Sequence, residues 1–100
     1  SIAAYGAAAK GVALLHAAGV EQGQIDFVAD RNVHKHGRLL PCTHIPVVPA
    51  DELAKRRPDF VLLLAWNFRD EILRQQADYI RQGGRFIVPI PEATILDAAA

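Results

Sequence analysis

The stretch Tyr5-Gly6-Ala7-Ala8-Ala9-Lys10-Gly11 sets the fold class of this chain. It follows an apolar run over residues 2–5 and leads into a helical pattern that reaches position 18. A strand that turns through small residues into a helix is the phosphate-side corner of a Rossmann-type unit. The free N–H groups at the start of such a helix attract anions. The stretch therefore favours a ligand with nucleotide-like groups near this corner.

The glycines of this stretch leave two interpretations open. Gly6 and Gly11 do not complete a G-x-G-x-x-G pattern, and Lys10 is not followed by the Ser or Thr of a P-loop. Without a ligand, Gly6 would serve a tight turn and Gly11 would let the helix pack closely on the sheet. The stretch by itself predicts the strand-to-helix corner of the fold, whereas the prediction of a bound ligand needs support from other residues.

The composition is that of one domain of 100 residues, with 51% hydrophobic residues. Eleven basic and eleven acidic residues cancel, which argues against nucleic acid or a membrane surface as a partner. The longest apolar run, residues 60–66, is too short to cross a bilayer, and no signal-peptide pattern is seen. The single cysteine, Cys42, excludes an intrachain disulfide. We expect a cytoplasmic location, and a start almost directly in a strand suggests a piece of a longer protein.

Strands and helices are predicted to alternate along the chain. Strands are expected over residues 2–5, 25–29, 45–48, 60–65 and 85–89, the third of them weak because Pro46 cannot donate to a strand ladder. Helices are expected over residues 10–18, closed by Gly19, and over residues 51–57. A further helix is expected to begin at Asn67 and to end at Gly83-Gly84. Its apolar stripe comprises Phe68, Ile72, Leu73, Ala77 and Ile80.

This alternation predicts an α/β fold. The specific expectation is a Rossmann-like three-layer sandwich with a parallel sheet of four to five strands in the order 3-2-1-4-5. The domain is expected over residues 1–96, followed by a frayed tail over residues 97–100. In such a sheet, ligands bind beyond the carboxyl ends of the strands, near the point where strand order reverses.

Asp30 is the acidic residue best placed for a ligand. It ends the second predicted strand roughly 20 residues after the glycine stretch, where dinucleotide folds bind ribose hydroxyls. Alternatively, Asp30 could pair with Arg31 or Lys35, or cap the turn. Trp66, at the exit of the fourth strand, could stack on a flat ring or close the core, and Asn67 is most simply a helix N-cap.

The sequence shows no pattern typical of a metal site or of a catalytic set. His34, His36 and His44 lie in one loop region close to Cys42, but their spacing matches no standard zinc pattern, so no metal is predicted. No Ser-His-Asp, paired-carboxylate or Cys-His set can be assembled. We therefore predict no catalytic residue in this chain.

The order of several short segments resembles one known domain. That known domain is the C-terminal domain of the S-adenosylmethionine-dependent C-methyltransferases that act on nucleotide-linked sugars. The resemblance covers nearly the whole chain. The segments that carry it are AYGAAAKG (residues 4–11), VADRN (28–32), KHG (35–37), LPCTHIPV (40–47), AWNFRDEI (65–72) and FIVPIP (86–91).

The resemblance implies a function. Members of this family methylate a carbon beside the ketone of a nucleotide-linked keto-deoxysugar, and an upstream domain of the same polypeptide binds S-adenosylmethionine and holds the catalytic groups. This chain would then be a substrate-binding domain, without a cofactor of its own and inactive in isolation. The substrate-binding residues implied are Tyr5, Gly6, Lys10, Gly11, Asp30, Asn32, Lys35, His44, Trp66 and Asn67.

Two other functions stay open at this point. One is a free-standing regulatory Rossmann domain that binds NAD or coenzyme A through the same glycine stretch and Asp30. The other is an interaction module that docks a partner through Trp66 and residues 34–44. A regulatory domain predicts tight binding of a small molecule by the isolated chain. The methyltransferase domain predicts weak binding, and the interaction module predicts none.

Overall fold

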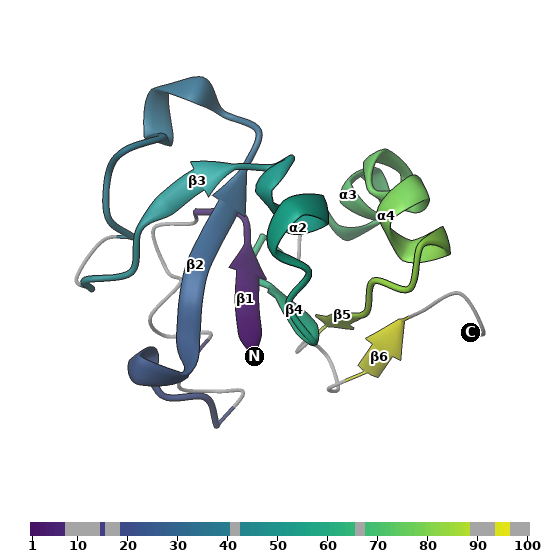
Figure 1. Cartoon of the computed structure of the whole chain (residues 1–100), viewed down its shortest axis with the longest axis horizontal. Helices are drawn as coiled ribbons and strands as arrows, with labels where there is room; N and C mark the ends of the chain where they lie inside the picture. The colour runs from purple at the N-terminus through teal and green to yellow at the C-terminus, as the bar shows by residue number, and fades with distance from the viewer. Residues whose placement is uncertain (8–14, 16–18, 41–42, 66–67, 89–93, 97–100) are drawn as a thin grey trace.

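The computed structural model describes residues 1–7, 15, 19–40, 43–65, 68–88 and 94–96. The strands within these residues form one sheet in the order β3-β2-β1-β4-β5-β6 (Figure 1). Neighbours from β3 to β5 are parallel, so the predicted order 3-2-1-4-5 is confirmed. The strands are β1 (Ile2–Tyr5), β2 (Ile25–Asp30), β3 (Val47–Pro49), β4 (Phe60–Leu63), β5 (Phe86–Val88) and β6 (Thr94–Leu96).

Strand β6 was not predicted, and it corrects the expectation that β5 is the last strand. It pairs antiparallel with β5 and extends the sheet by one strand. Only residues 89–93 separate the two strands, and a parallel crossover needs a dozen or more residues. An antiparallel return is therefore the geometry that so short a connection allows. Residues 97–100, the predicted frayed tail, lie outside the described part of the chain.

The described helices are α2 (Glu52–Arg56), α3 (Arg69–Gln75) and α4 (Ala77–Arg81), with 3₁₀ turns η1 (Gln22–Gln24) and η2 (Val33–Lys35). Sequence patterning predicted one continuous helix in place of α3 and α4, but Gln76 leaves the helical conformation and separates the two helices. None of the described helices combines the length and the apolar character needed to cross a membrane.

Most of the predicted first helix, over residues 10–18, lies outside the described residues, but its end can be followed. Leu15 is helical and buried. The Val20 N–H donates to the Leu15 carbonyl at 2.9 Å, and Gly19 has a φ of 71°. This hydrogen bond around a left-handed glycine is the Schellman ending of a helix. The predicted role of Gly19 is thus confirmed.

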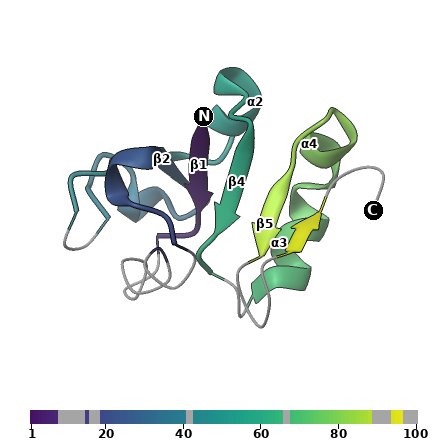
Figure 2. The same cartoon turned by 90° about the horizontal axis from the view of Figure 1, so that it is seen from below.

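Each face of the sheet carries its own hydrophobic core. Successive residues of β4 alternate between the two cores, with Val61 and Leu63 in one and Leu62 in the other. The first core receives side chains from α2, α3 and α4, and α3 and α4 lie beside β5 (Figure 1, Figure 2). The second core contains Leu15 and Leu40. Strands that are buried on both faces are typical of parallel sheets, and they confirm the three-layer arrangement.

Candidate functional site

A pocket of about 510 Å³ opens at the carboxyl ends of β1, β2 and β4. Because β1 lies between β2 and β4, this is the point at which strand order reverses. The pocket therefore lies where the order of elements predicts a ligand. Its lining consists of Tyr5, Gly6, Ala7, Asp30, Arg31, Asn32, Lys35, Ala65, Phe68, Glu71, Ile72 and Gln75.

Gly6 forms the floor of the pocket, where the exits of β1 and β4 meet. Its N–H donates to the Ala29 carbonyl at 2.8 Å, and its φ is 92°. A Cβ added at this position would lie 2.6 Å from the Cβ of Ala65. Both the backbone conformation and the close approach of β4 thus require glycine, which supports the tight-turn interpretation of Gly6.

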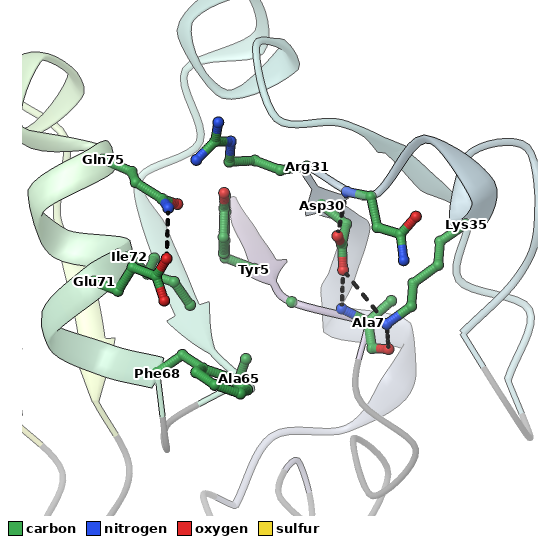
Figure 3. Close-up of a pocket in the computed structure, with 12 residues that line it drawn as sticks. Tyr5, Ala7, Asp30, Arg31, Lys35, Ala65, Phe68, Glu71, Ile72 and Gln75 are labelled. Atoms are coloured by element: carbon green, nitrogen blue, oxygen red, sulfur yellow. Dashed lines mark hydrogen bonds and ion pairs between the residues drawn. The ribbon is translucent and has the colours of Figure 1, made fainter.

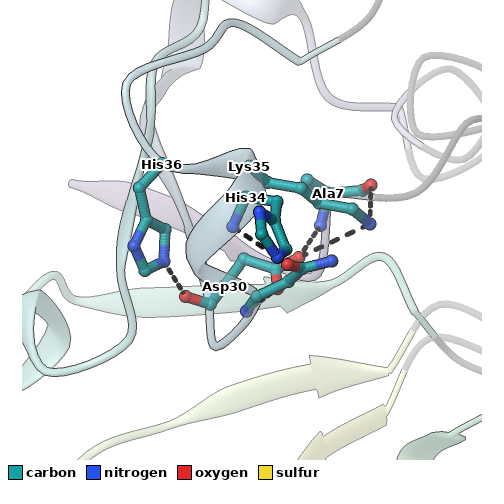
Figure 4. A network of polar contacts seen from close by, with 6 residues as sticks. Ala7, Asp30, His34, Lys35 and His36 are labelled. Atoms are coloured by element: carbon teal, nitrogen blue, oxygen red, sulfur yellow. Dashed lines mark hydrogen bonds and ion pairs between the residues drawn. The ribbon is translucent and has the colours of Figure 1, made fainter.

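Asp30 joins the exit of β1 to the exit of β2 (Figure 4). One carboxylate oxygen accepts from the Ala7 N–H at 2.7 Å, and the other accepts from the Asn32 N–H at 2.7 Å. The Lys35 Nζ donates to the Ala7 carbonyl at 3.0 Å and lies 4.0 Å from the Asp30 carboxylate. We call this group of contacts the Asp30 clasp. It supports the interpretation of Asp30 as a turn cap that pairs with Lys35.

Two further contacts hold the chain beyond β2 in place. The Asn32 side-chain oxygen accepts from the His34 N–H at 3.0 Å, which starts the 3₁₀ turn η2. The His36 Nε2 donates to the Asp30 carbonyl at 2.6 Å (Figure 4). Short polar side chains that bond to nearby backbone groups favour turns of this kind. This wall of the pocket is therefore built by hydrogen bonds rather than by a helix.

The opposite wall is one face of α3 and the residue before it (Figure 3). Phe68, Glu71, Ile72 and Gln75 follow the spacing i, i+3, i+4, i+7 that places side chains on one side of a helix. Ile72 also reaches the core, whereas Phe68 is 57% exposed. The prediction that Phe68 belongs to the buried apolar stripe is wrong. Phe68 precedes α3 at the pocket edge, where no described layer covers it.

Tyr5 stands between the two walls. It packs edge-to-face on Phe86, with ring centroids 6.2 Å apart, and its hydroxyl accepts from the Gln76 Nε2 at 3.4 Å. Burial raises the pKa of Tyr5 above its usual 10.0, an effect that the Gln76 hydrogen bond and the Arg31 charge partly offset. The Tyr5 hydroxyl therefore stays protonated at neutral pH and remains a hydrogen-bond donor.

The structure brings some of the predicted substrate-binding residues together. Tyr5, Gly6, Asp30, Asn32 and Lys35 all line the pocket. His44 is exposed and does not line it, so its predicted role gains no support from the geometry. The remaining ones, Lys10, Gly11, Trp66 and Asn67, lie outside the described residues.

Sequence reasoning missed the α3 wall and the pocket role of Arg31. The spacing of Phe68, Glu71, Ile72 and Gln75 was a signal that could have identified that wall. Within the described ranges, no group of three or more His, Cys, Asp or Glu side chains is close enough to hold a metal. Cys42 falls outside those ranges.

Comparison with known proteins gives this pocket its context. Residues 1–91 match the family described as the C-methyltransferase C-terminal domain. The chain is 44% identical over 98 residues to the C-methyltransferase NovU of Streptomyces niveus. That match covers 98% of this chain but only 23% of the relative, so the chain spans less than a quarter of the relative's length. These matches give no support to a free-standing regulatory domain. The chain belongs to the family of C-methyltransferase C-terminal domains.

Proposed function

We propose that this domain forms the substrate-binding wall of an S-adenosylmethionine-dependent C-methyltransferase that acts on a nucleotide-linked keto-deoxysugar. The observation that carries the proposal is the pocket at the strand-order reversal of a chain that belongs to this family. In this proposal, an upstream domain of the same polypeptide holds the methyl donor and the catalytic groups. The isolated domain is inactive, and the complete enzyme is cytoplasmic.

The pocket has the size and the mixed chemistry that such a substrate needs. Its volume of about 510 Å³ falls within the usual range for small-molecule sites, roughly 300–1,000 Å³. Glu71 and Gln75 offer acceptors and donors to sugar hydroxyls, and the exposed Phe68 ring offers a flat apolar face. These groups support a ligand that is polar at several points and flat at one.

The proposed reaction needs little chemistry from this domain. In this reaction a base would remove the acidic proton beside the ketone to give a stabilised enolate. The methyl donor would supply an electrophilic methyl group, which passes to the enolate carbon as its bond to sulfur breaks and the donor leaves as a thioether. Positioning the carbon against the methyl group lowers the barrier because the entropy of bringing the two reactants together is lost on binding, before the chemical step. The domain contributes by holding the sugar nucleotide between the two walls of the pocket, one shaped by the Asp30 clasp and the other by α3.

Calorimetric titration of the complete polypeptide with UDP-, dTDP- and GDP-linked sugars tests this proposal. Gln75→Trp places a large ring on the pocket face of α3, whereas Arg74→Trp places the same ring on an exposed neighbour that does not line the pocket. We expect Gln75→Trp to weaken sugar-nucleotide binding about 10-fold or more, since a blocked site loses its contacts. Arg74→Trp should have little effect.

S-adenosylmethionine binding serves as the internal control, because both variants should retain it if the methyl donor is held elsewhere. Equal sugar-nucleotide affinities for the Gln75→Trp variant and the unchanged protein would show that the pocket is not the substrate site. The absence of binding by any of the sugar nucleotides would refute the proposed substrate class.

A further inference from the structure

The guanidinium group of Arg31 lies at the pocket without a polar partner among the described residues. Arg31 directly follows β2, lines the pocket and is exposed. Its guanidinium group forms no hydrogen bond or ion pair with the other residues that the structure describes. A guanidinium carries five N–H donors in a planar fork that matches the oxygens of phosphates and carboxylates. Arg31 therefore presents its donor groups to whatever occupies the pocket.

The Tyr5 hydroxyl adds a second donor to the same part of the pocket. Its oxygen already accepts from Gln76, and no acceptor for its proton is found among the described residues. The Arg31 charge acts on the Tyr5 hydroxyl, and both groups face the side chains of Glu71 and Gln75 on α3 (Figure 3). Two donors without acceptors on the same side of the pocket favour a ligand group that is rich in acceptors, and the charge of Arg31 favours an anionic one.

The other charged groups of the pocket do not attract an anion as the side with Arg31 and Tyr5 does. Lys35 and Asp30 neutralise each other within the Asp30 clasp, where Lys35 also donates to the Ala7 carbonyl. Glu71 lies on the α3 wall and accepts from Gln75 at 3.3 Å. A carboxylate on that wall repels a second anion, so an anionic ligand group is driven toward the β2 side.

We propose that Arg31 and Tyr5 form an anion subsite that binds the phosphate groups of a nucleotide-linked ligand. The inference rests on the proposed function, and it adds the orientation of the substrate. The phosphates lie against the β2 wall, and the hydroxyl-bearing part of the ligand faces Glu71 and Gln75. A fork-shaped cation and a neutral phenol together favour a phosphate over a ligand that carries its own donors.

The test uses the complete polypeptide and calorimetric titration with UDP, dTDP and GDP, each beside its nucleoside. Arg31→Ala should weaken binding of the best diphosphate about 10-fold or more, as expected for hydrogen bonds to a charged group. Arg31→Lys should recover only part of that loss, because an ammonium group lacks the planar fork. Tyr5→Phe keeps the buried ring but removes the hydroxyl, so it should also weaken binding of the diphosphate. Arg38→Ala, an exposed arginine outside the pocket lining, should not.

The nucleosides and S-adenosylmethionine identify which group the subsite binds. Their affinities should stay unchanged in Arg31→Ala, because nucleosides carry no phosphate and the carboxylate of the methyl donor is bound elsewhere. Equal losses for a diphosphate and its nucleoside would overturn the anion subsite while leaving the pocket as the substrate site. Loss of S-adenosylmethionine binding alone would assign Arg31 to that carboxylate instead and overturn the inference. If no diphosphate binds the unchanged protein although a sugar nucleotide does, the anion subsite fails and the proposed function stands. If neither binds, both fail.

Discussion

Replacement of Gly6 by alanine tests how tightly the exits of β1 and β4 are joined beneath the pocket. The new Cβ would lie 2.6 Å from the Ala65 Cβ and 3.1 Å from the Ala65 nitrogen. Carbon atoms in contact normally lie about 3.5–4.0 Å apart, so one strand exit would have to move by about 1 Å. Crowding of this kind costs about 1–3 kcal/mol, and a left-handed φ costs a non-glycine residue about 1–2 kcal/mol.

The expected loss for Gly6→Ala is therefore about 2–5 kcal/mol in the free energy of unfolding, a large part of the total for a small domain. Urea unfolding of the 100-residue chain, followed by circular dichroism, measures this loss. Gly37→Ala is the matched control. Its φ is 80°, but nothing lies within 4 Å of the added Cβ, so only the backbone cost of about 1–2 kcal/mol remains.

Ala65→Gly provides a second check, because it removes the atom that the new Cβ would meet. The cost of Gly6→Ala should fall by about 1 kcal/mol or more in the Ala65→Gly background, which a double-mutant cycle measures. The relief is partial because the Ala65 nitrogen remains 3.1 Å away. The reasoning would be refuted by a Gly6→Ala loss no larger than that of Gly37→Ala, or by an identical loss in both backgrounds.

Three further predictions concern stability and use the same unfolding measurement. Asp30→Asn should cost about 1–3 kcal/mol, because an amide cannot accept from both the Ala7 and the Asn32 N–H groups, whereas Asp26→Asn on the exposed side of β2 should cost almost nothing. Leu63→Ala removes a fully buried side chain and should cost about 2–5 kcal/mol, against well under 1 kcal/mol for the half-exposed Leu39→Ala; equal losses would contradict the assigned core. Burial raises the pKa of Tyr79 above 10.0, so its contribution to stability is complete below pH 10 and is lost as the pH rises through the folded-state pKa. Tyr79→Phe should therefore show a shallower loss of stability above pH 10 than the unchanged chain, and parallel curves would refute this reasoning.

Much of the fold could be predicted from local patterns. The apolar run before Gly6 and the continuous apolar run over residues 60–65 predict strands buried on both faces, because runs this short, bounded by glycine or proline nearby, are typical of the strands of a covered parallel sheet. Alternation with helices then predicts parallel strands, and the expected order 3-2-1-4-5 is confirmed by the structure. Strand β6 escaped prediction because three residues after a proline-containing segment carry too little periodicity to identify a strand.

The pocket shows the limit of local patterns. The chain order alone placed Tyr5, Gly6 and Asp30 at the carboxyl edge of the sheet, since consecutive parallel strands must end at the same edge. It could not decide between a ligand and a turn cap for the Asp30 carboxylate. That choice depends on the Ala7 N–H, which is 23 residues away in sequence and 2.7 Å away in space.

The second wall depended on tertiary packing even more strongly. The sequence of α3 offers two adjacent faces with apolar residues, and periodicity does not say which part of them is covered. The sheet buries Ile72 and leaves Phe68 exposed at the pocket edge. The parallel strands and their helical connections therefore follow from the chain alone, because apolar runs and connection lengths are local properties, whereas the antiparallel strand β6 came only with the structure. The pocket follows only from the packed structure, because its two walls come from segments that meet across the point where strand order reverses.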